Sequence, residues 1–270
     1  MVGHGICKKK YKNYEVGENI IYYFDDKTDI DIENIGESEI IVPPYIMNAR
    51  EFHEHFERVL TTKKRSYEWF SIINNFITPY ITTPELYKVA RELLDDYAEK
   101  LENCPGSDGQ HHWCSLGLLR HIIGVAENVV YLCNKYKFLN MEVMIFGAVF
   151  HDIGKINDYI WNTNKQTWDL STSREVITHV PESLMIIKPY LDKYSISEEY
   201  KIQLLSVIGQ HMGDEIASVC EMNSPESIYL NFADHIDALS DAISVAKDDV
   251  KCTGWSSEVI PVANKKLYFF

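Results

Sequence analysis

The chain has 270 residues, of which 46% are hydrophobic and 24% are charged, and its formal net charge is −14. This length and composition allow a sizeable core, so we expect one large domain, or one domain with a small appendage, and no global disorder. The acidic balance argues against binding to long nucleic-acid tracts, because such binding depends on lysine and arginine. It does not exclude a phosphate-bearing substrate, because bound cations offset acidity locally.

No apolar run approaches the ~20 residues that cross a bilayer, so we expect no membrane span and no membrane partner. The chain has six cysteines, and none has the C-x-x-C spacing of a zinc finger or a redox motif. The first residues do not resemble a signal peptide, so we expect free thiols and a cytoplasmic location.

The residue pattern divides the chain into three regions. Residues 1–45 carry two short β-type runs, at 20–24 and 40–42, which predict a small hairpin-like appendage. Residues 46–250 have helical periodicity and predict an all-α helical bundle with its core at 105–245. The tail at 251–270 predicts a strand that pairs with the N-terminal hairpin. The predicted helices begin near residue 48 and continue at 66–77, 84–101, 116–136, 141–152, 180–190, 198–208 and 225–246. Thr83 and Ser224 are the expected N-caps before Pro84 and Pro225.

A histidine and an aspartate stand side by side at the end of the most apolar of these helices. The run 144–150 predicts a buried helix that carries His151 and Asp152 to the floor of a pocket. We expect Gly154 to end this helix directly behind the pair. Imidazole nitrogen and carboxylate oxygen are both good ligands for a catalytic divalent metal.

Further metal-type residues occupy the inner faces or ends of other predicted helices. A buried carboxylate such as Asp234 is costly unless a cation or several donors compensate it. One such residue alone is an ordinary core or surface side chain, but six of them on five helices indicate a shared site. The pattern predicts two cations with Asp152 as the bridging ligand. The six expected ligands are His121, His151, Asp152, His179, His211 and Asp234.

The order of these residues resembles that of the HD-domain metal-dependent phosphohydrolases. The resemblance is closest to the HD domain of YhaM-type 3′→5′ exoribonucleases and to the related N-terminal domain of conjugative relaxase (TraI-like) proteins. In that family a double histidine precedes a Gly-Leu-Leu-x-His helix, and here His111-His112 precede the stretch from Gly117 to His121. The other matching stretches are Phe150 to Lys155, His179-Val180, Gln210 to Gly213, Ser224 to Ser227 and Ala233 to Ala238.

The chain departs from the family pattern at a few positions. Met212 replaces the second histidine of a Ser-His-His-Gly motif, and Arg120 replaces a glutamate. Residues 1–45 are too short for the OB-fold that YhaM-type proteins carry for RNA binding. Neither substitution removes an expected ligand, so the resemblance implies an intact HD-type site with six ligands and two metals.

This resemblance implies hydrolysis of a phosphoester bond by a water that two divalent metals activate. We expect Lys155 to stabilise charge on the phosphate and Asp237 to orient a ligand or the water. His111, His112 and Arg174 are candidates for substrate contact. Four histidines and two aspartates suit Mn²⁺, our first choice, and also Fe²⁺, Zn²⁺, Co²⁺ or Mg²⁺.

Three functions remain open from the sequence. The first is a phosphodiesterase or 3′→5′ exonuclease that acts on single-stranded RNA or DNA ends. The second is a phosphohydrolase of nucleoside mono- or triphosphates or cyclic nucleotides, which the net charge of −14 favours. The third is a non-catalytic HD regulatory module, which the complete set of expected ligands disfavours. The sequence does not specify the oligomeric state.

Overall fold

The computed structural model describes residues 2–6, 19–23, 65–213, 219, 221–248, 250 and 253–270. The chain divides into two compact units, Met1–Lys64 and Arg65–Phe270. The predicted boundary at residue 45 and the predicted helix near residue 48 lie outside the described residues.

Two antiparallel strands form the described part of the first unit. β1 (Val2–Ile6) pairs with β2 (Asn19–Tyr23), and Val2 lies opposite Tyr23. The strand predicted at 20–24 is therefore confirmed, but its partner is β1. Two of the five residues of β1 are glycines, and because glycine is depleted in strands, β propensity does not predict this strand. The run at 40–42, which we expected as the partner, lies outside the described residues.

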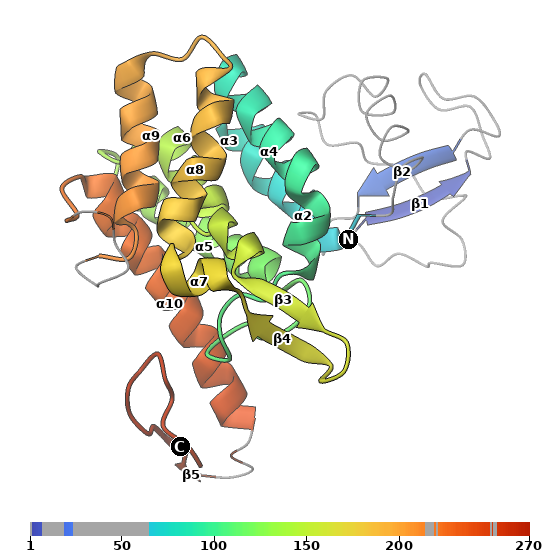
Figure 1. Cartoon of the computed structure of the whole chain (residues 1–270), viewed down its shortest axis with the longest axis vertical. Helices are drawn as coiled ribbons and strands as arrows, with labels where there is room; N and C mark the ends of the chain where they lie inside the picture. The colour runs from blue at the N-terminus through green and yellow to red at the C-terminus, as the bar shows by residue number, and fades with distance from the viewer. Residues whose placement is uncertain are drawn as a thin grey trace. The chain divides into compact units, whose positions relative to one another are not determined.

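The second unit is a helical bundle, as predicted (Figure 1). Each of the longer helices begins and ends within a few residues of the range predicted from its apolar period. The helical elements are α2 (Tyr67–Ile72), the π-helical turn η2 (Ile73–Ile77), α3 (Thr78–Tyr80), α4 (Pro84–Asn103), α5 (Gly117–Lys135), α6 (Met141–Phe150), the 3-10 turn η3 (Ile153–Asn157), α7 (Thr172–Val176), α8 (His179–Asp192), α9 (Glu198–Gln210) and α10 (Pro225–Asp248). None of these helices is both long and apolar enough to cross a membrane.

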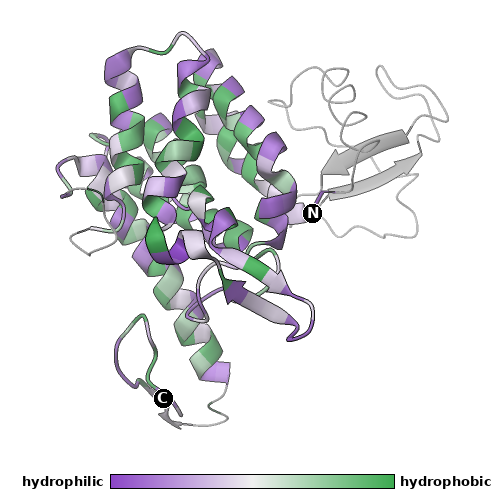
Figure 2. Ribbon diagram, in the orientation of Figure 1, coloured by the Kyte–Doolittle hydropathy of each residue, from purple (hydrophilic) through white to green (hydrophobic). Residues whose placement is uncertain are grey.

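Helix α6 lies at the centre of the bundle and packs against α5, α9 and α10. Every residue from Val143 to Phe150 is buried, which explains why its sequence is apolar on all sides. The side chain of Asn140 caps its first turn by accepting from the backbone N–H groups of Glu142 and Val143. The surrounding helices turn apolar faces inward and polar faces outward (Figure 2). This packing fixes the end of α6, where the His-Asp pair follows.

Two hairpins correct the prediction of an all-helical region and of the tail. β3 (Tyr159–Asn162) pairs antiparallel with β4 (Thr167–Leu170) between η3 and α7. Its aromatic and β-branched residues flank a polar turn, which is a strand pattern within the region predicted to be all-helical. In the tail, β6 (Tyr268–Phe269) pairs with β5 (Gly254–Trp255) and not with the N-terminal hairpin. Local pairing of this kind closes a short loop at lower entropic cost.

Candidate metal centre

The His-Asp pair is placed by the transition from α6 to η3. The N–H of His151 donates to the carbonyl of Gly147 and completes the last turn of α6. His151 is 0% exposed and Asp152 is 2% exposed, so the pair lies in the interior as predicted. Ser183 on α8 supports this turn, since its hydroxyl accepts from the N–H of Gly154 and donates to the carbonyl of His151.

Gly154 has a different role from the predicted one. The helix ends at Phe150, before the pair, and Gly154 lies inside η3. A Cβ atom at this position would lie 2.1 Å from the carbonyl oxygen of His179 and 2.7 Å from the N–H of Ser183. Glycine is required there because η3 and the first turn of α8 approach each other closely. That approach brings His179 to the pair.

Three histidines present the same ring nitrogen, Nε2, to a common point. In each ring Nδ1 donates a hydrogen bond: His121 to Asp237 Oδ2 at 2.7 Å, His151 to the Ala148 carbonyl at 3.0 Å, and His211 to the Ile208 carbonyl at 2.7 Å. A carbonyl oxygen can only accept, so it fixes the proton on Nδ1 and leaves the Nε2 lone pair available. Such hydrogen bonds from the second nitrogen are usual for histidines that bind metals.

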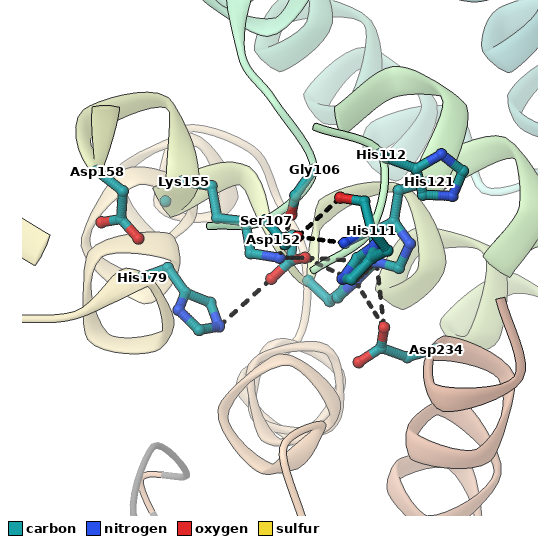
Figure 3. A network of polar contacts seen from close by, with 12 residues as sticks. Gly106, Ser107, His111, His112, His121, Asp152, Lys155, Asp158, His179 and Asp234 are labelled. Atoms are coloured by element: carbon teal, nitrogen blue, oxygen red, sulfur yellow. Dashed lines mark hydrogen bonds and ion pairs between the residues drawn. The ribbon is translucent and has the colours of Figure 1, made fainter. Parts of the chain in front are cut away.

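The first group of converging atoms comes from His121, His151, Asp152 and Asp234. Figure 3 shows three of them, His121, Asp152 and Asp234, directed toward one another. His121 Nε2 lies 3.1 Å from Asp234 Oδ1, 3.5 Å from Asp152 Oδ2 and 3.3 Å from His151 Nε2. His151 Nε2 lies 3.3 Å from Asp152 Oδ2 and 4.0 Å from Asp234 Oδ1. Ligands bound to one ion at ~2.1 Å are separated by roughly 3–3.5 Å, so these spacings suit a shared cation.

The electrostatic environment where the atoms of the first group meet also favours a positive charge. Burial lowers the pKa of His121, but hydrogen bonds that its ring donates to Asp152, Asp234 and Asp237 outweigh burial and raise that pKa well above its ordinary value. The pKa of Asp234 is shifted downward, because His121 and His151 outweigh the effect of its burial. The carboxylates thus attract a cation to the place where the Nε2 atoms meet.

The second group consists of Asp152, His179 and His211. Asp152 Oδ1 lies 3.4 Å from His179 Nε2 and 3.6 Å from His211 Nε2. Among the described residues, these three atoms are buried and have no hydrogen-bond partner. An unsatisfied buried polar atom costs about 1–3 kcal/mol, and a divalent cation satisfies all three at once. Asp152 therefore offers one oxygen to each group, and the donor set fits two cations.

Lys155 lies against the same aspartate. Its Nζ is 2.5 Å from Asp152 Oδ2 and donates to the carbonyl of Gly106 at 2.7 Å. Burial lowers the pKa of Lys155, but Asp152 outweighs this effect and raises it. The ammonium group is therefore charged and directed at the pair, and it also holds the loop between α4 and α5 against η3.

Asp237 joins the first group to the loop before α5. Its Oδ2 accepts from His121 Nδ1 at 2.7 Å and from His112 Nε2 at 3.0 Å. These two bonds outweigh burial and lower the pKa of Asp237 to about 2, so the acceptor is ionised. Asp241, one turn further along α10, accepts from the backbone N–H of His112 at 2.6 Å. His112 thus lies behind His121, in contact with two carboxylates.

The remaining predicted substrate residues have separate environments. The ring of His111 lies 4.9 Å from that of His121, and burial followed by repulsion from His121 lowers its pKa to about 3. His111, His112 and His121 form a further group with atoms close enough to hold a cation. Arg174 Nε lies 3.5 Å from Asp158 Oδ2. Burial raises the pKa of Asp158 to about 6, against the effect of Arg174.

The sequence did not single out four polar residues close to the site, or the unusual backbone of Thr178 beside it. Asp158 and Ser183 lie on or beside η3 and α8, while Asn231 and Asp241 belong to α10. Asn231 Nδ2 donates to the carbonyl of His211 at 2.7 Å. Thr178, before His179, has φ 68° and ψ 162°, a region that β-branched residues rarely adopt. Only tertiary neighbours reveal these roles, although Asp158 does follow the His-Asp motif closely in sequence.

Comparison with known proteins agrees with this geometry. The family model of the HD domain matches residues 118–239. The chain contains an HD domain. All six residues of the two groups lie within the matched stretch, so the resemblance inferred from the motifs is confirmed. The helical HD fold with a small β appendage is confirmed as well.

Several curated relatives of this chain are 3′-5′ exoribonucleases named YhaM. The relative from Geobacillus sp. (strain WCH70) is 25% identical over 201 residues, which cover 71% of this chain and 60% of the relative. The relative from Bacillus pumilus is 22% identical over 186 residues, with 68% and 58% covered. The chain thus spans about three fifths of the length of these relatives. The comparison with solved structures finds no match.

Proposed function

We propose that this HD domain chain is a metal-dependent phosphohydrolase, and that it acts as a phosphodiesterase or 3′-5′ exonuclease on single-stranded RNA or DNA ends. The relatives' activity as 3′-5′ exoribonucleases supports this substrate class. The net charge of −14 favours a second candidate, a nucleotide phosphohydrolase, because a small substrate does not need an extended basic groove.

One observation carries the proposal. The three buried atoms without hydrogen-bond partners, Asp152 Oδ1, His179 Nε2 and His211 Nε2, make up the second group and converge beside the first group. His121, His151, Asp152 and Asp234 would hold one divalent cation, and Asp152, His179 and His211 the other. When bound, such a pair lowers the pKa of a water and offsets negative charge on a phosphoryl group. Mn²⁺ is our first choice for this nitrogen and oxygen set.

The chain's own residues would prepare the site for this chemistry. Asp237 and the carbonyls of Ala148 and Ile208 keep the proton on Nδ1 of three histidines, so that each Nε2 can act as a ligand. Lys155 places a charged ammonium group beside Asp152. We propose that this group contacts a phosphoryl oxygen and stabilises its charge as the ester bond breaks.

A substrate panel with Mn²⁺-loaded protein tests the proposal. The panel contains bis-p-nitrophenyl phosphate, 3′-labelled and 5′-labelled single-stranded oligonucleotides, and nucleoside mono-, tri- and cyclic phosphates. We expect the diester to be hydrolysed and the 5′-labelled strand to shorten progressively from its 3′ end. Turnover of nucleotides without any strand shortening would select the second candidate.

A matched pair of variants assigns the activity to the site. Asp152→Ala should abolish turnover while the circular dichroism spectrum is retained. Asp192→Ala removes an aspartate whose partners are Lys188 and Lys201, and should leave turnover unchanged. Full activity in Asp152→Ala would refute the assignment of the activity to this site. No turnover of any substrate by metal-loaded wild-type protein would refute the proposal that the protein is an enzyme.

A further inference from the structure

Four aromatic side chains gather where the β3–β4 hairpin meets the loop between α4 and α5. Trp113 on the loop contacts Tyr159 and Trp168, with ring centroids 5.8 Å and 5.1 Å apart. Trp161 contacts Trp168, its cross-strand partner, at 4.9 Å. We call these four residues the aromatic platform. The hairpin that carries three of them extends from the helical bundle beside this loop (Figure 1).

The platform remains accessible even though it is apolar. Trp161 is 46% exposed, and the other three side chains are half-buried. Other exposed apolar side chains are near it in sequence, namely Ile160, on the opposite face of β3, and then Leu170, Val176 and Ile177. A cross-strand aromatic pair stabilises a hairpin, which explains contact between Trp161 and Trp168. It does not explain why a third tryptophan, Trp113, joins the pair from a separate loop, and accessible apolar side chains gathered in this way commonly mark a binding surface.

The platform is continuous with the metal centre along both segments of chain that form it. Trp113 directly follows His111 and His112. Tyr159 directly follows Asp158 and the η3 turn that carries Lys155. The two segments are also joined, because Lys155 Nζ donates to the carbonyl of Gly106 at 2.7 Å. The Trp168 indole donates to the carbonyl of Asn103 at 3.2 Å, which anchors β4 to the end of α4.

We propose that the aromatic platform stacks on the bases of a single-stranded nucleic acid whose phosphodiester enters the metal centre. This inference rests on the proposed function and names how its substrate is held. Aromatic side chains bind single strands of any sequence by stacking on their bases. A chain with a net charge of −14 gains little from a phosphate-tracking basic groove, so stacking beside the metal centre is the available means of recognition.

Binding measurements with metal-loaded protein test this role. The probe is a fluorescein-labelled strand of about ten nucleotides with phosphorothioate linkages, which resist hydrolysis, and its affinity is read by fluorescence anisotropy. We expect Trp161→Ala to raise the Kd about tenfold and Trp161→Phe to restore most of the affinity. Comparing the Kd values of RNA and DNA versions of the strand shows which of the two nucleic acids the platform binds more tightly.

Trp255 provides a matched control on another hairpin. It is 64% exposed and contacts its cross-strand partner Tyr268 at 5.3 Å, but it belongs to the C-terminal hairpin β5–β6. Trp255→Ala should leave the Kd unchanged. A wild-type Kd that is equal for the normal strand and for an abasic strand of the same length would overturn the stacking role. Equal Kd values for wild type and Trp161→Ala, with the fold retained by circular dichroism, would overturn it too.

Hydrolysis of bis-p-nitrophenyl phosphate separates this inference from the proposed function. Because that substrate carries no nucleobases and no strand, Trp161→Ala should lose much less activity towards it than towards an oligonucleotide, for which its kcat/KM should fall about tenfold. If no substrate is hydrolysed but the strand still binds through Trp161, the proposed function fails and the platform stands. If the diester is hydrolysed and the strand does not bind, the platform alone fails.

Discussion

Replacing Asp237 by asparagine tests whether the protein uses its first ligand group as a metal site. The carboxylate of Asp237 does not belong to either group, but its Oδ2 accepts from Nδ1 of His121 at 2.7 Å. In Asp237→Asn the negative charge is lost. Where the amide nitrogen faces His121, the proton moves to Nε2 and removes the lone pair that a cation needs.

The size of the effect follows from this single contact. Loss of a hydrogen-bond partner behind a metal ligand reduces metal affinity about 10- to 100-fold. A hydrogen bond to a charged group contributes about 1.5–3 kcal/mol. Since ~1.4 kcal/mol corresponds to a tenfold change in an equilibrium constant, this energy agrees with the expected 10- to 100-fold loss of affinity. The second bond of Asp237, from His112 at 3.0 Å, does not involve a ligand. We therefore expect about a 30-fold weaker first site, or ~2 kcal/mol.

Titration of metal-free protein with Mn²⁺ in competition with a fluorescent chelator measures this change. Asp241→Asn is the matched control, because Asp241 lies on the same helix and contacts His112 but not His121. Its metal affinity should stay within about twofold of wild type. Unchanged affinity in Asp237→Asn, or equal losses in both variants, would refute the account of the histidine tautomer.

Three further changes have defined outcomes. Gly124→Ala should weaken Mn²⁺ binding in the same titration, although alanine ordinarily favours a helix, because its Cβ would lie 1.8 Å from Asp237 Oδ1; unaltered binding would contradict the close approach. Burial raises the pKa of Glu142, but hydrogen bonds from Thr83 outweigh burial, so the pKa in the folded protein is lowered. The carboxylate therefore stabilises the fold above its unfolded-state pKa of ~4.3, and this stabilisation is lost as pH falls through the folded-state pKa. Glu142→Gln should therefore lower the free energy of unfolding by about 1–2 kcal/mol at neutral pH, allowing for partial exposure, and urea titrations near pH 3 should show little difference. Phe146→Ala should lower the free energy of unfolding in urea by about 3–5 kcal/mol, since this ring is fully buried in α6, and a loss below ~1 kcal/mol would be incompatible with that position.

The helical part of the fold could be predicted because its apolar period is regular. The ranges of α5 and α10 follow from one buried face each, and the apolar run of α6 indicates a helix buried on all sides. The β3–β4 hairpin was missed, although its aromatic and β-branched residues are typical of strands, because the surrounding helical pattern was extended across it. β1 was missed because glycine carries no strand preference.

The six expected ligands could be named because metal-type residues at core positions are conspicuous in a sequence. Their supporting residues could not, since Ser183 and Asn231 act only through tertiary contacts with His151 and His211. Thr83 is a partial case: it precedes α4 as predicted, but its hydroxyl donates to Glu142 rather than capping its own helix. The sequence marks which side chains can bind a cation, and the fold decides which of them meet.

Metal content and metal separation in crystals of Mn²⁺-loaded protein test the central claim most directly. Anomalous diffraction should locate two ions per chain, about 3.5–4 Å apart, with one oxygen of Asp152 on each. Elemental analysis of the same protein should give two equivalents of metal. A single ion held by His121, His151, Asp152 and Asp234, with His179 and His211 left without metal, would contradict the two-metal account.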